Sequence, residues 1–278
     1  MSRKIAVGFM IVLLCLGLIL TSALAAPKRG GTYRASMATD LTNLDLHKTQ
    51  AQIDNAVLGM TVYEPLFTYD AKFNVKPFLC ESYKMSPDGL TLILNLKKGV
   101  KFHNKTEMKA EDVKFCLDRV RDPNLPGAQR NSMLDVKEVK ITGPYQVQMI
   151  LSKPIPNIFY TLATSVGTIG MMPKKVLESH DNKVLRPIGT GPYEFVAWER
   201  DTKVMLKRFE AYSSADGPVN GYLGKRNRYF DQLIFNVMKE PATRIMALDR
   251  GDLDAVPVLP YQQIDDLKKR KDLQVRTG

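Results

Sequence analysis

Histidine and cysteine are scarce in this sequence, with three of each among 278 residues. The histidines, His47, His103 and His180, stand far apart, and no His-Cys-carboxylate spacing indicates a metal cage. Each histidine is therefore predicted to be a surface or hydrogen-bonded residue rather than a metal ligand. We expect no metal site and no cofactor.

Recognisable catalytic motifs are also missing. Gly30-Gly31 precedes the first expected strand instead of following one, which argues against a dinucleotide-binding turn. The segment Ala163-Thr164-Ser165-Val166-Gly167 resembles a nucleophile elbow with alanine in place of the first glycine. An elbow needs a strand before the serine and a helix after it, and the flanking residues favour neither. We expect no catalytic residue and no enzyme, with an exported hydrolase that uses Ser165 as the alternative.

The first 25 residues are predicted to be a cleavable signal peptide. Arg3 and Lys4 precede an uncharged apolar run over residues 5–20, and Ala23 and Ala25 are small residues at the positions that a signal peptidase reads. The run is shorter than the roughly 20 residues that span a bilayer, and a retained membrane anchor is the alternative. Cys15 lies inside the run, so we expect a periplasmic protein without a lipid anchor.

Export changes how the charge of the chain is interpreted. The formal charge is +11, and loss of the leader with Arg3 and Lys4 leaves +9. Such a balance would favour nucleic-acid binding in the cytoplasm, but that partner is not expected outside the cell. The densest basic run, Lys268 to Lys271, is predicted to be the solvated face of a helix.

Two cysteines remain after removal of the leader, Cys80 and Cys116. An oxidising compartment would allow them to pair, but the sequence does not place their Cα atoms within disulfide range. Two buried free thiols are the preferred prediction, and a disulfide stays open.

Hydrophobic alternation predicts a mixed α/β chain with several hairpins, which a purely parallel doubly wound sheet would not show. The expected strands are residues 31–37, 91–96, 100–102, 136–141, 146–151, 193–198, 203–208, 233–237, 253–256 and 273–275. The expected helices are residues 110–120, 241–249 and 264–271. Gly89 and Gly99 are expected at turns with positive φ.

Six sequence blocks in chain order resemble the family 5 solute-binding proteins, which include the peptide- and nickel-binding components of ABC importers. The blocks run from about Gly30 to the end of the chain. They are Gly30-Gly31-Thr32 with Asn43-Leu44-Asp45-Leu46-His47; Val62-Tyr63-Glu64-Pro65-Leu66 with Lys76-Pro77-Phe78-Leu79; Ser86-Pro87-Asp88-Gly89 with Lys98-Gly99-Val100; Ala110-Glu111-Asp112-Val113; Gly189-Thr190-Gly191-Pro192-Tyr193; and Ala247-Leu248-Asp249-Arg250-Gly251-Asp252-Leu253-Asp254. Lys109 departs from the family's usual Ser or Thr, which would forfeit an N-cap worth about 1 kcal/mol unless Thr106 or Asp112 compensates.

The resemblance implies a periplasmic binding protein-like fold of type II, in which two lobes close on a ligand by a hinge motion. The chain is expected to hold the first lobe only, with a core of residues 27–59 and 187–278 and an inserted subdomain of residues 60–186. The second lobe would follow Gly278. The chain alone is therefore expected to bind no ligand of the family tightly.

The resemblance also implies the function and the partners. The expected role is solute binding, with a peptide as the default ligand, and delivery to an ABC permease by a monomeric binding protein. Nickel chelates, sugars and a sensory role in chemotaxis stay open. The ligand-binding residues implied are Thr49, Gln50 and Gln52 after the first strand, and Val258 in the stretch after Asp254.

Overall fold

The structure is a computed structural model that describes residues 28–59, 61–125, 127, 130–163 and 168–276. The predicted signal peptide and Ser165 lie outside the described residues. None of the helices in these ranges has the length and apolar character needed to cross a bilayer.

The first sheet joins the first strand of the chain to three strands from its second half. Strand β1 (Thr32–Met37) lies at one edge, followed by β10 (Gln232–Val237), β9 (Lys203–Arg208) and β8 (Tyr193–Glu199). The pairing of β1 with β10 is parallel, and the other two pairings are antiparallel. Such a mixed sheet can bring the start of the chain against a strand near its end.

The outer edge of β1 is partly covered by the segment after α6. The backbone N–H of Ser36 donates to Ala255 O at 3.2 Å, and that of Asp254 donates to Arg34 O at 2.8 Å. Ala255 therefore forms a single parallel bridge with Ala35. The prediction of a strand over residues 253–256 is wrong, because this segment forms only the single bridge at Ala255.

The second sheet is antiparallel throughout. Its order is β4 (Cys80–Met85), β5 (Thr91–Leu96), β7 (Gln146–Leu151) and β6 (Val136–Gly143). Every second residue of β5 and β7 is buried, as the alternation predicts. Helix α3 (Ala110–Arg119) packs against β6 and β7 and buries Val113, Cys116 and Leu117.

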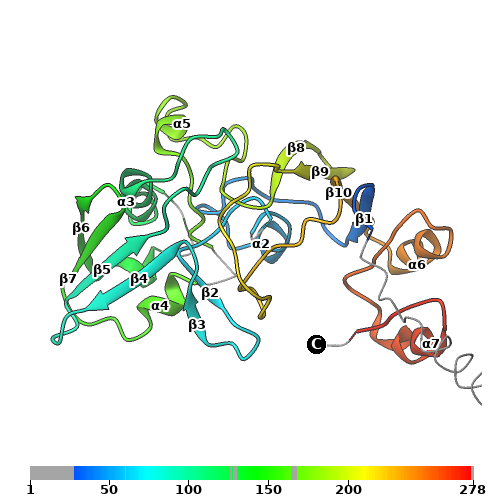
Figure 1. The fold of residues 1–278 in the computed structure, drawn as a ribbon. Coiled ribbons are helices and arrows are strands. Elements are labelled where there is room, and N and C mark those ends of the chain that lie inside the picture. Colours follow the sequence, from blue (N-terminus) through cyan, green and yellow to red (C-terminus); the bar gives the residue numbers. More distant parts are fainter. Residues whose placement is uncertain (1–27, 60, 126, 128–129, 164–167, 277–278) are drawn as a thin grey trace, which may run out of the picture.

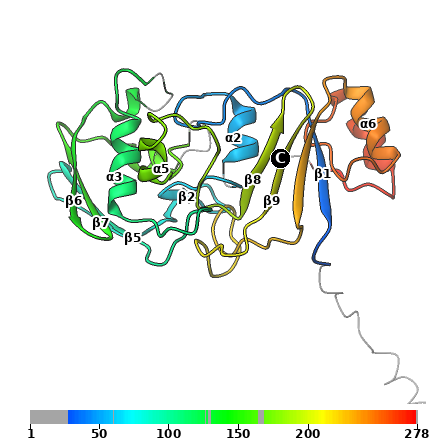
Figure 2. The same cartoon turned by 90° about the horizontal axis from the view of Figure 1, so that it is seen from above.

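Shorter elements complete the fold. They are α2 (Gln52–Leu58), β2 (Phe67–Tyr69), β3 (Val75–Pro77), η1 (Asn131–Met133), α4 (Ile158–Thr161), α5 (Lys174–Glu178), α6 (Pro241–Asp249), η2 (Tyr261–Gln263) and α7 (Ile264–Lys269). Figures 1 and 2 show the β4–β7 sheet with α3 at one end of the molecule and α6 with α7 at the other. The β1–β10–β9–β8 sheet and α2 lie between them.

Helix α3 begins without a side-chain acceptor at its N-cap, because lysine offers only donors. Asp112 compensates: its Oδ2 accepts from the backbone N–H of Lys109 at 2.9 Å. The other oxygen, Oδ1, accepts from the backbone N–H of Lys174 at 2.9 Å. One carboxylate thus closes the first turn of α3 and joins it to the start of α5.

Two of the sequence blocks meet in space. The backbone N–H groups of Gly191 and Tyr193 donate to Val62 O at 3.0 Å and Thr61 O at 2.9 Å. Thr190 Oγ1 donates to Glu64 Oε2 at 2.8 Å. Pro192 directly precedes β8, as expected for a tight turn into a strand. Gly189 and Gly191 are required for a further reason: a Cβ atom at either position would collide with the backbone of residues 61–62.

The local sequence predictions have mixed outcomes. The strands predicted from alternation and the three predicted helices are present, some with shifted ends, and Gly89 and Gly99 have φ angles of 69° and 73°. The predicted strands over 100–102 and 273–275 are wrong, and only an isolated bridge of Lys101 with Glu107 marks the first. The elements not predicted include α2, β2, β3, β4, η1, α5 and η2.

The prediction of two free thiols is confirmed. Cys80 and Cys116 are both buried and unpaired with each other. Burial raises the pKa of each thiol to about 12. Protonated, buried thiols are poor nucleophiles, so both act as small apolar core residues.

Candidate functional site

A groove of about 380 Å³ opens at the carboxyl end of β1. We call it the β1 groove. Its walls come from the end of β1 and the residues after it (36–39), the first turns of α2 (52, 53, 56 and 57), Phe235 of β10, Arg244 of α6, and residues 257–258. Met37, Ile53, Val57 and Val258 make the lining largely apolar. A concave, mainly apolar surface of this size with a few polar groups is typical of a small-molecule site.

Two polar atoms that belong to groove residues are buried without a partner within the described residues. They are Ser36 Oγ and Arg244 Nε. Arg244 is held in place by its Nη1, which donates to Met238 O at 2.9 Å and Lys239 O at 2.8 Å. A buried donor without an acceptor costs free energy, so these two atoms mark a place where an added acceptor would be stabilising.

The sequence-predicted ligand residues fall into two groups. Gln52 and Val258, which are distant in the chain, line the same groove, and the Val258 side chain is 61% exposed. Gln50 is exposed outside the groove lining. Thr49 is buried, its hydroxyl donating to Asp54 at 2.7 Å and accepting from the N–H of Ala51 at 3.0 Å. Their role in binding stays a prediction for all four.

Sequence reasoning missed Ser36 and Arg244. The position of Arg244 on α6 could have indicated that its side chain is buried. It lies three residues before Ala247, and residues three apart share one face of a helix, which here is the buried face. A charged side chain on such a face calls for a partner or a function.

The loop between β1 and α2 is held by one buried carboxylate, Asp54. Its oxygens accept from the backbone N–H of Thr42 at 2.7 Å, that of Asn43 at 3.1 Å, and the hydroxyls of Thr42 at 2.5 Å and Thr49 at 2.7 Å. Because Asp54 itself lies on α2, these bonds fix the loop to the helix that forms one wall of the groove. The groove is therefore shaped before any ligand arrives.

A second carboxylate, Asp40, ties the same loop to the sheet. Its Oδ1 accepts from Trp198 Nε1 at 2.9 Å, and its Oδ2 accepts from the backbone N–H of Asp201 at 2.7 Å. Trp198 and Asp201 belong to the β8–β9 hairpin. The loop is thus anchored on the core sheet as well as on α2.

Behind the loop lies a buried ion pair. Arg119 Nη1 and Nη2 donate to the two oxygens of Asp45 at 2.9 and 2.6 Å, and both side chains are at most 5% exposed. Nη2 also donates to Asn182 O at 2.9 Å. Burial alone raises the pKa of Asp45, but the hydrogen bond and charge of Arg119 bring it below its ordinary value. The pair joins the loop, α3 and the chain after α5.

His47 and His103 are structural and electrically neutral. His47 Nδ1 accepts from Arg119 Nη1 at 3.1 Å, so Nε2 carries the proton and donates to Gly170 O at 2.8 Å. His103 Nδ1 accepts from the N–H of Gly189 at 3.3 Å, and its Nε2 donates to Gly191 O at 3.0 Å. Burial lowers the pKa of each ring to about 4. With both nitrogens engaged, neither ring has a lone pair for a metal.

These two histidines predict a loss of stability in mild acid. The unfolded chain takes up a proton near the ordinary pKa of 6.5, whereas the folded chain does so only near 4. The unfolded state therefore binds more protons in this window, and stability falls as the pH drops through it, by about 2–3 kcal/mol per histidine. Glu64 and Asp112, whose pKa values burial raises, act in the opposite direction.

Urea unfolding of the wild type and of His47→Gln between neutral pH and about pH 4.5 isolates the contribution of His47. Glutamine keeps a donor for Gly170 O but does not titrate. The loss of stability with falling pH is expected to be smaller in the variant. An identical pH slope in both proteins would show that His47 is not buried neutral.

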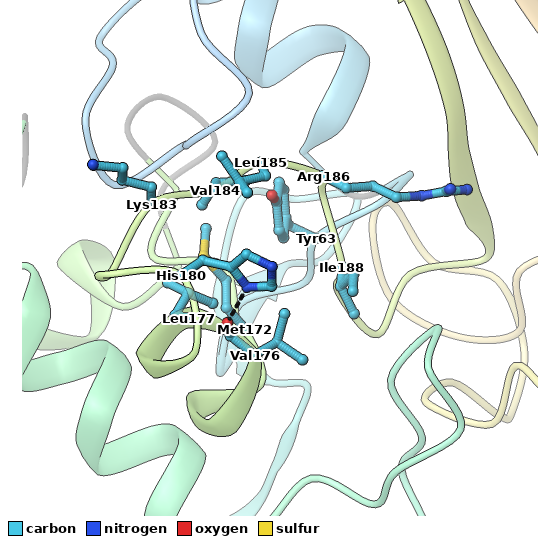
Figure 3. A pocket seen from close by; sticks show the side chains of 10 residues that line it. All are labelled: Tyr63, Met172, Val176, Leu177, His180, Lys183, Val184, Leu185, Arg186 and Ile188. Carbon is cyan, nitrogen blue, oxygen red and sulfur yellow. Dashed lines mark hydrogen bonds between the residues drawn. The ribbon is translucent and has the colours of Figure 1, made fainter.

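A second cavity, of about 240 Å³, lies beside α5 and is shown in Figure 3. Three of its four polar side chains have partners among the described residues: Tyr63 Oη donates to Leu44 O at 3.0 Å, Arg186 Nη2 to Phe195 O at 2.6 Å, and His180 Nδ1 lies 2.8 Å from Val176 O. Apart from Lys183, the other lining residues, such as Met172, Leu177 and Ile188, are apolar. This cavity resembles a packing gap along the chain segment 183–188 more than a recognition site.

A metal site would need several ligating side chains gathered in one place. The described residues contain no group of three or more His, Cys, Asp or Glu side chains placed to hold a metal ion. Ser165, on which the hydrolase alternative rests, lies outside the described residues.

Comparison with known proteins adds to this geometry. Over 241 residues the chain is 27% identical to the glutathione-binding protein GsiB of Escherichia coli K12, which covers 86% of this chain and 44% of that protein. The chain thus spans less than half the length of the curated relatives it matches. Among solved structures, AgaA of A. tumefaciens R10 in complex with agropinic acid superposes with a TM-score of 0.77 and 25% identity, over 87% of this chain and 46% of that one.

NikZ of Campylobacter jejuni, solved with Ni(L-His), gives a TM-score of 0.73 at 25% identity, over 87% of this chain and 46% of the other. The mixed α/β fold is therefore that of the periplasmic binding proteins. The sequence model of the family matches residues 74–278, which is well over half of the chain. The chain belongs to the bacterial extracellular solute-binding proteins of family 5.

Proposed function

We propose that the β1 groove is one wall of a solute-binding cleft, and that the whole protein captures its ligand outside the cytoplasmic membrane for an ABC permease. The observation that carries this proposal is the groove itself. It gathers Gln52 and Val258 with two buried donors that have no partner in the described part of the chain, Ser36 Oγ and Arg244 Nε. Membership of the family supports solute binding as the role.

The proposed division of the chain is a core of residues 27–59 and 187–278 and an insert of residues 60–186. The sheet topology supports it, because β1, β8, β9 and β10 form one sheet and β4 to β7 form another. All walls of the β1 groove come from the core part. A second lobe that closes over this wall by a hinge would complete the cleft, and the ligand would favour the closed form by its additional contacts there.

The proposed ligand is a peptide or another small solute with an apolar part and an acceptor group. The apolar lining of the groove would contact the apolar part of the solute. After a small side-chain adjustment, Ser36 Oγ or Arg244 Nε would donate a hydrogen bond to its acceptor group. Relatives are named for glutathione binding or were solved with agropinic acid and Ni(L-His). The protein is proposed to reach the periplasm by a cleaved signal peptide and to act as a monomer.

One wall alone should bind weakly. Ligand pockets normally bury about 70–90% of a small ligand, which an open groove cannot do. Calorimetry on residues 27–278 with trialanine, glutathione or nickel–histidine is expected to show no binding in the micromolar range. Micromolar affinity for any of these would contradict the shared cleft.

A groove-filling substitution tests the location. Ala56 is exposed on α2 and lines the groove, so Ala56→Trp would occupy the space of a ligand while leaving the core untouched. We expect weak binding of trialanine or glutathione, followed by NMR, to fall by about tenfold or more.

The matched control is Ala71→Trp, the same change at an exposed position in the loop between β2 and β3. It should leave binding unchanged. Equal effects of the two substitutions would show that the ligand does not use the β1 groove.

A further inference from the structure

A second, chemically different pocket lies at the opposite end of β1. It has a volume of about 420 Å³ and is built from the residues just before β1, the end of β9 and the segment leading into β10. Five cationic side chains line it, and we call it the basic pocket. They are Arg29, Arg208, Lys225, Arg226 and Arg228.

The two acidic side chains of the basic pocket are both engaged by a single arginine. Arg208 Nε lies 2.8 Å from Glu210 Oε1, and its Nη2 lies 2.9 Å from Asp231 Oδ1. Asp231 also accepts from the backbone N–H of Gly31 at 2.9 Å. Both carboxylates of the pocket, Glu210 and Asp231, are therefore paired with Arg208 and leave the other cations unneutralised by lining residues.

Three cations of the pocket have no acidic partner within the ranges that the structure describes. They are Arg29, Lys225 and Arg228. Like charges gathered in a concave surface raise each other's potential and attract counter-ions. The five cationic and two acidic lining side chains carry a net formal charge of +3, although Arg226 also interacts electrostatically with the buried Glu64, which is not part of the lining.

Two of the arginines are held in fixed orientations. The guanidinium of Arg228 lies over the Tyr212 ring, 5.4 Å from its centroid, and its Nη1 donates to the backbone oxygen of Phe209. Arg226 lies over the Phe78 ring at 5.2 Å and donates to Tyr222 O at 3.0 Å. Stacked, hydrogen-bonded guanidinium groups lose little freedom when an anion binds, which favours recognition.

We propose that the basic pocket binds a phosphate-type anion, either a free phosphate or phosphomonoester or the phosphate of a lipid headgroup. Such a group offers several acceptor oxygens to a cluster of Arg and Lys donors and matches the surplus positive charge. A pocket of this volume admits a small phosphorylated group. The site is independent of the β1 groove, since the two lie at opposite ends of the same strand and share no residue.

Binding of inorganic phosphate and phenyl phosphate to the purified chain, measured by calorimetry at low ionic strength, tests this. The double variant Arg29→Gln, Lys225→Gln removes two exposed cations of the pocket and should fold normally. Its phosphate affinity is expected to fall by about tenfold or more. The control, Lys268→Gln with Lys271→Gln, makes the same charge change at exposed positions in and just after α7 and should keep the affinity.

The source of the phosphate is resolved by flotation with vesicles of phosphatidylglycerol and phosphatidylcholine in equal parts, against phosphatidylcholine alone. Binding only to the soluble anions assigns a free phosphate group. Vesicle binding that phosphate competes away, and that the pocket variant loses, assigns a headgroup. Both results support the proposal. Absence of binding to all probes, or an equal loss in the Lys268 and Lys271 control, overturns it.

Discussion

Arg119→Met is expected to lower the free energy of unfolding by about 3–5 kcal/mol, because it leaves the carboxylate of Asp45 buried without its partner. Asp45 and Arg119 are at most 5% exposed, and the arginine also donates to His47 and Asn182. Their contacts join the loop before α2, helix α3 and the chain after α5. Denaturant unfolding with matched m-values measures the change.

Two further variants identify the cause. Asp45→Asn combined with Arg119→Met removes both charges while keeping an acceptor for the N–H of His47, so it should recover much of the stability lost in the single variant. Lys269→Met, which breaks an exposed pair with Asp266, should leave stability nearly unchanged. A loss below about 1 kcal/mol for Arg119→Met would show that the ion pair does not hold these segments together.

Gly191→Ala is expected to cost at least about 3 kcal/mol or to prevent folding. A Cβ at Gly191 would lie 2.2 Å from Thr61 O and 2.7 Å from Thr61 C, which are backbone atoms that cannot move alone. The N–H of Gly191 also donates to Val62 O, so the contact cannot open without loss of a buried hydrogen bond.

Gly99→Ala provides the comparison. Gly99 has a φ of 73° and open space where a Cβ would lie, so alanine there meets only backbone strain of about 1–2 kcal/mol. Thermal unfolding of both variants separates the two causes. If Gly191→Ala proved as mild as Gly99→Ala, the close contact between residues 61–62 and 189–191 would be absent in solution.

The sequence predicted those elements whose signal is local. Every second residue of strands β5 and β7 is apolar because one face of each strand is buried, and this pattern can be recognised from the sequence alone. Strand β4 has mostly exposed residues after Cys80, so it lacks the pattern, and its pairing with β5 is visible only in three dimensions. The short helix α2 was missed because Asp54 and neighbouring contacts, rather than periodicity, define it.

The site divides in the same way. Gln52 and Val258 came from resemblance to a family, and the structure brings both into one groove. Ser36 and Arg244 could not be derived locally, because the burial of Ser36 Oγ and Arg244 Nε without a partner among the described residues depends on where β1, α6 and the chain around Ala255 meet. The parallel pairing of β1 with β10 that creates this meeting joins residues at opposite ends of the chain, which no local pattern encodes.

The most direct test of the β1 groove as the solute wall is a map of where a ligand touches the chain. Backbone amide NMR during titration with trialanine and glutathione provides it. The largest shift changes are expected on residues 36–39, 52–57 and 258, together with Arg244. Changes centred instead on the cavity beside α5, around Leu177 and Ile188, or on the basic pocket, would contradict it.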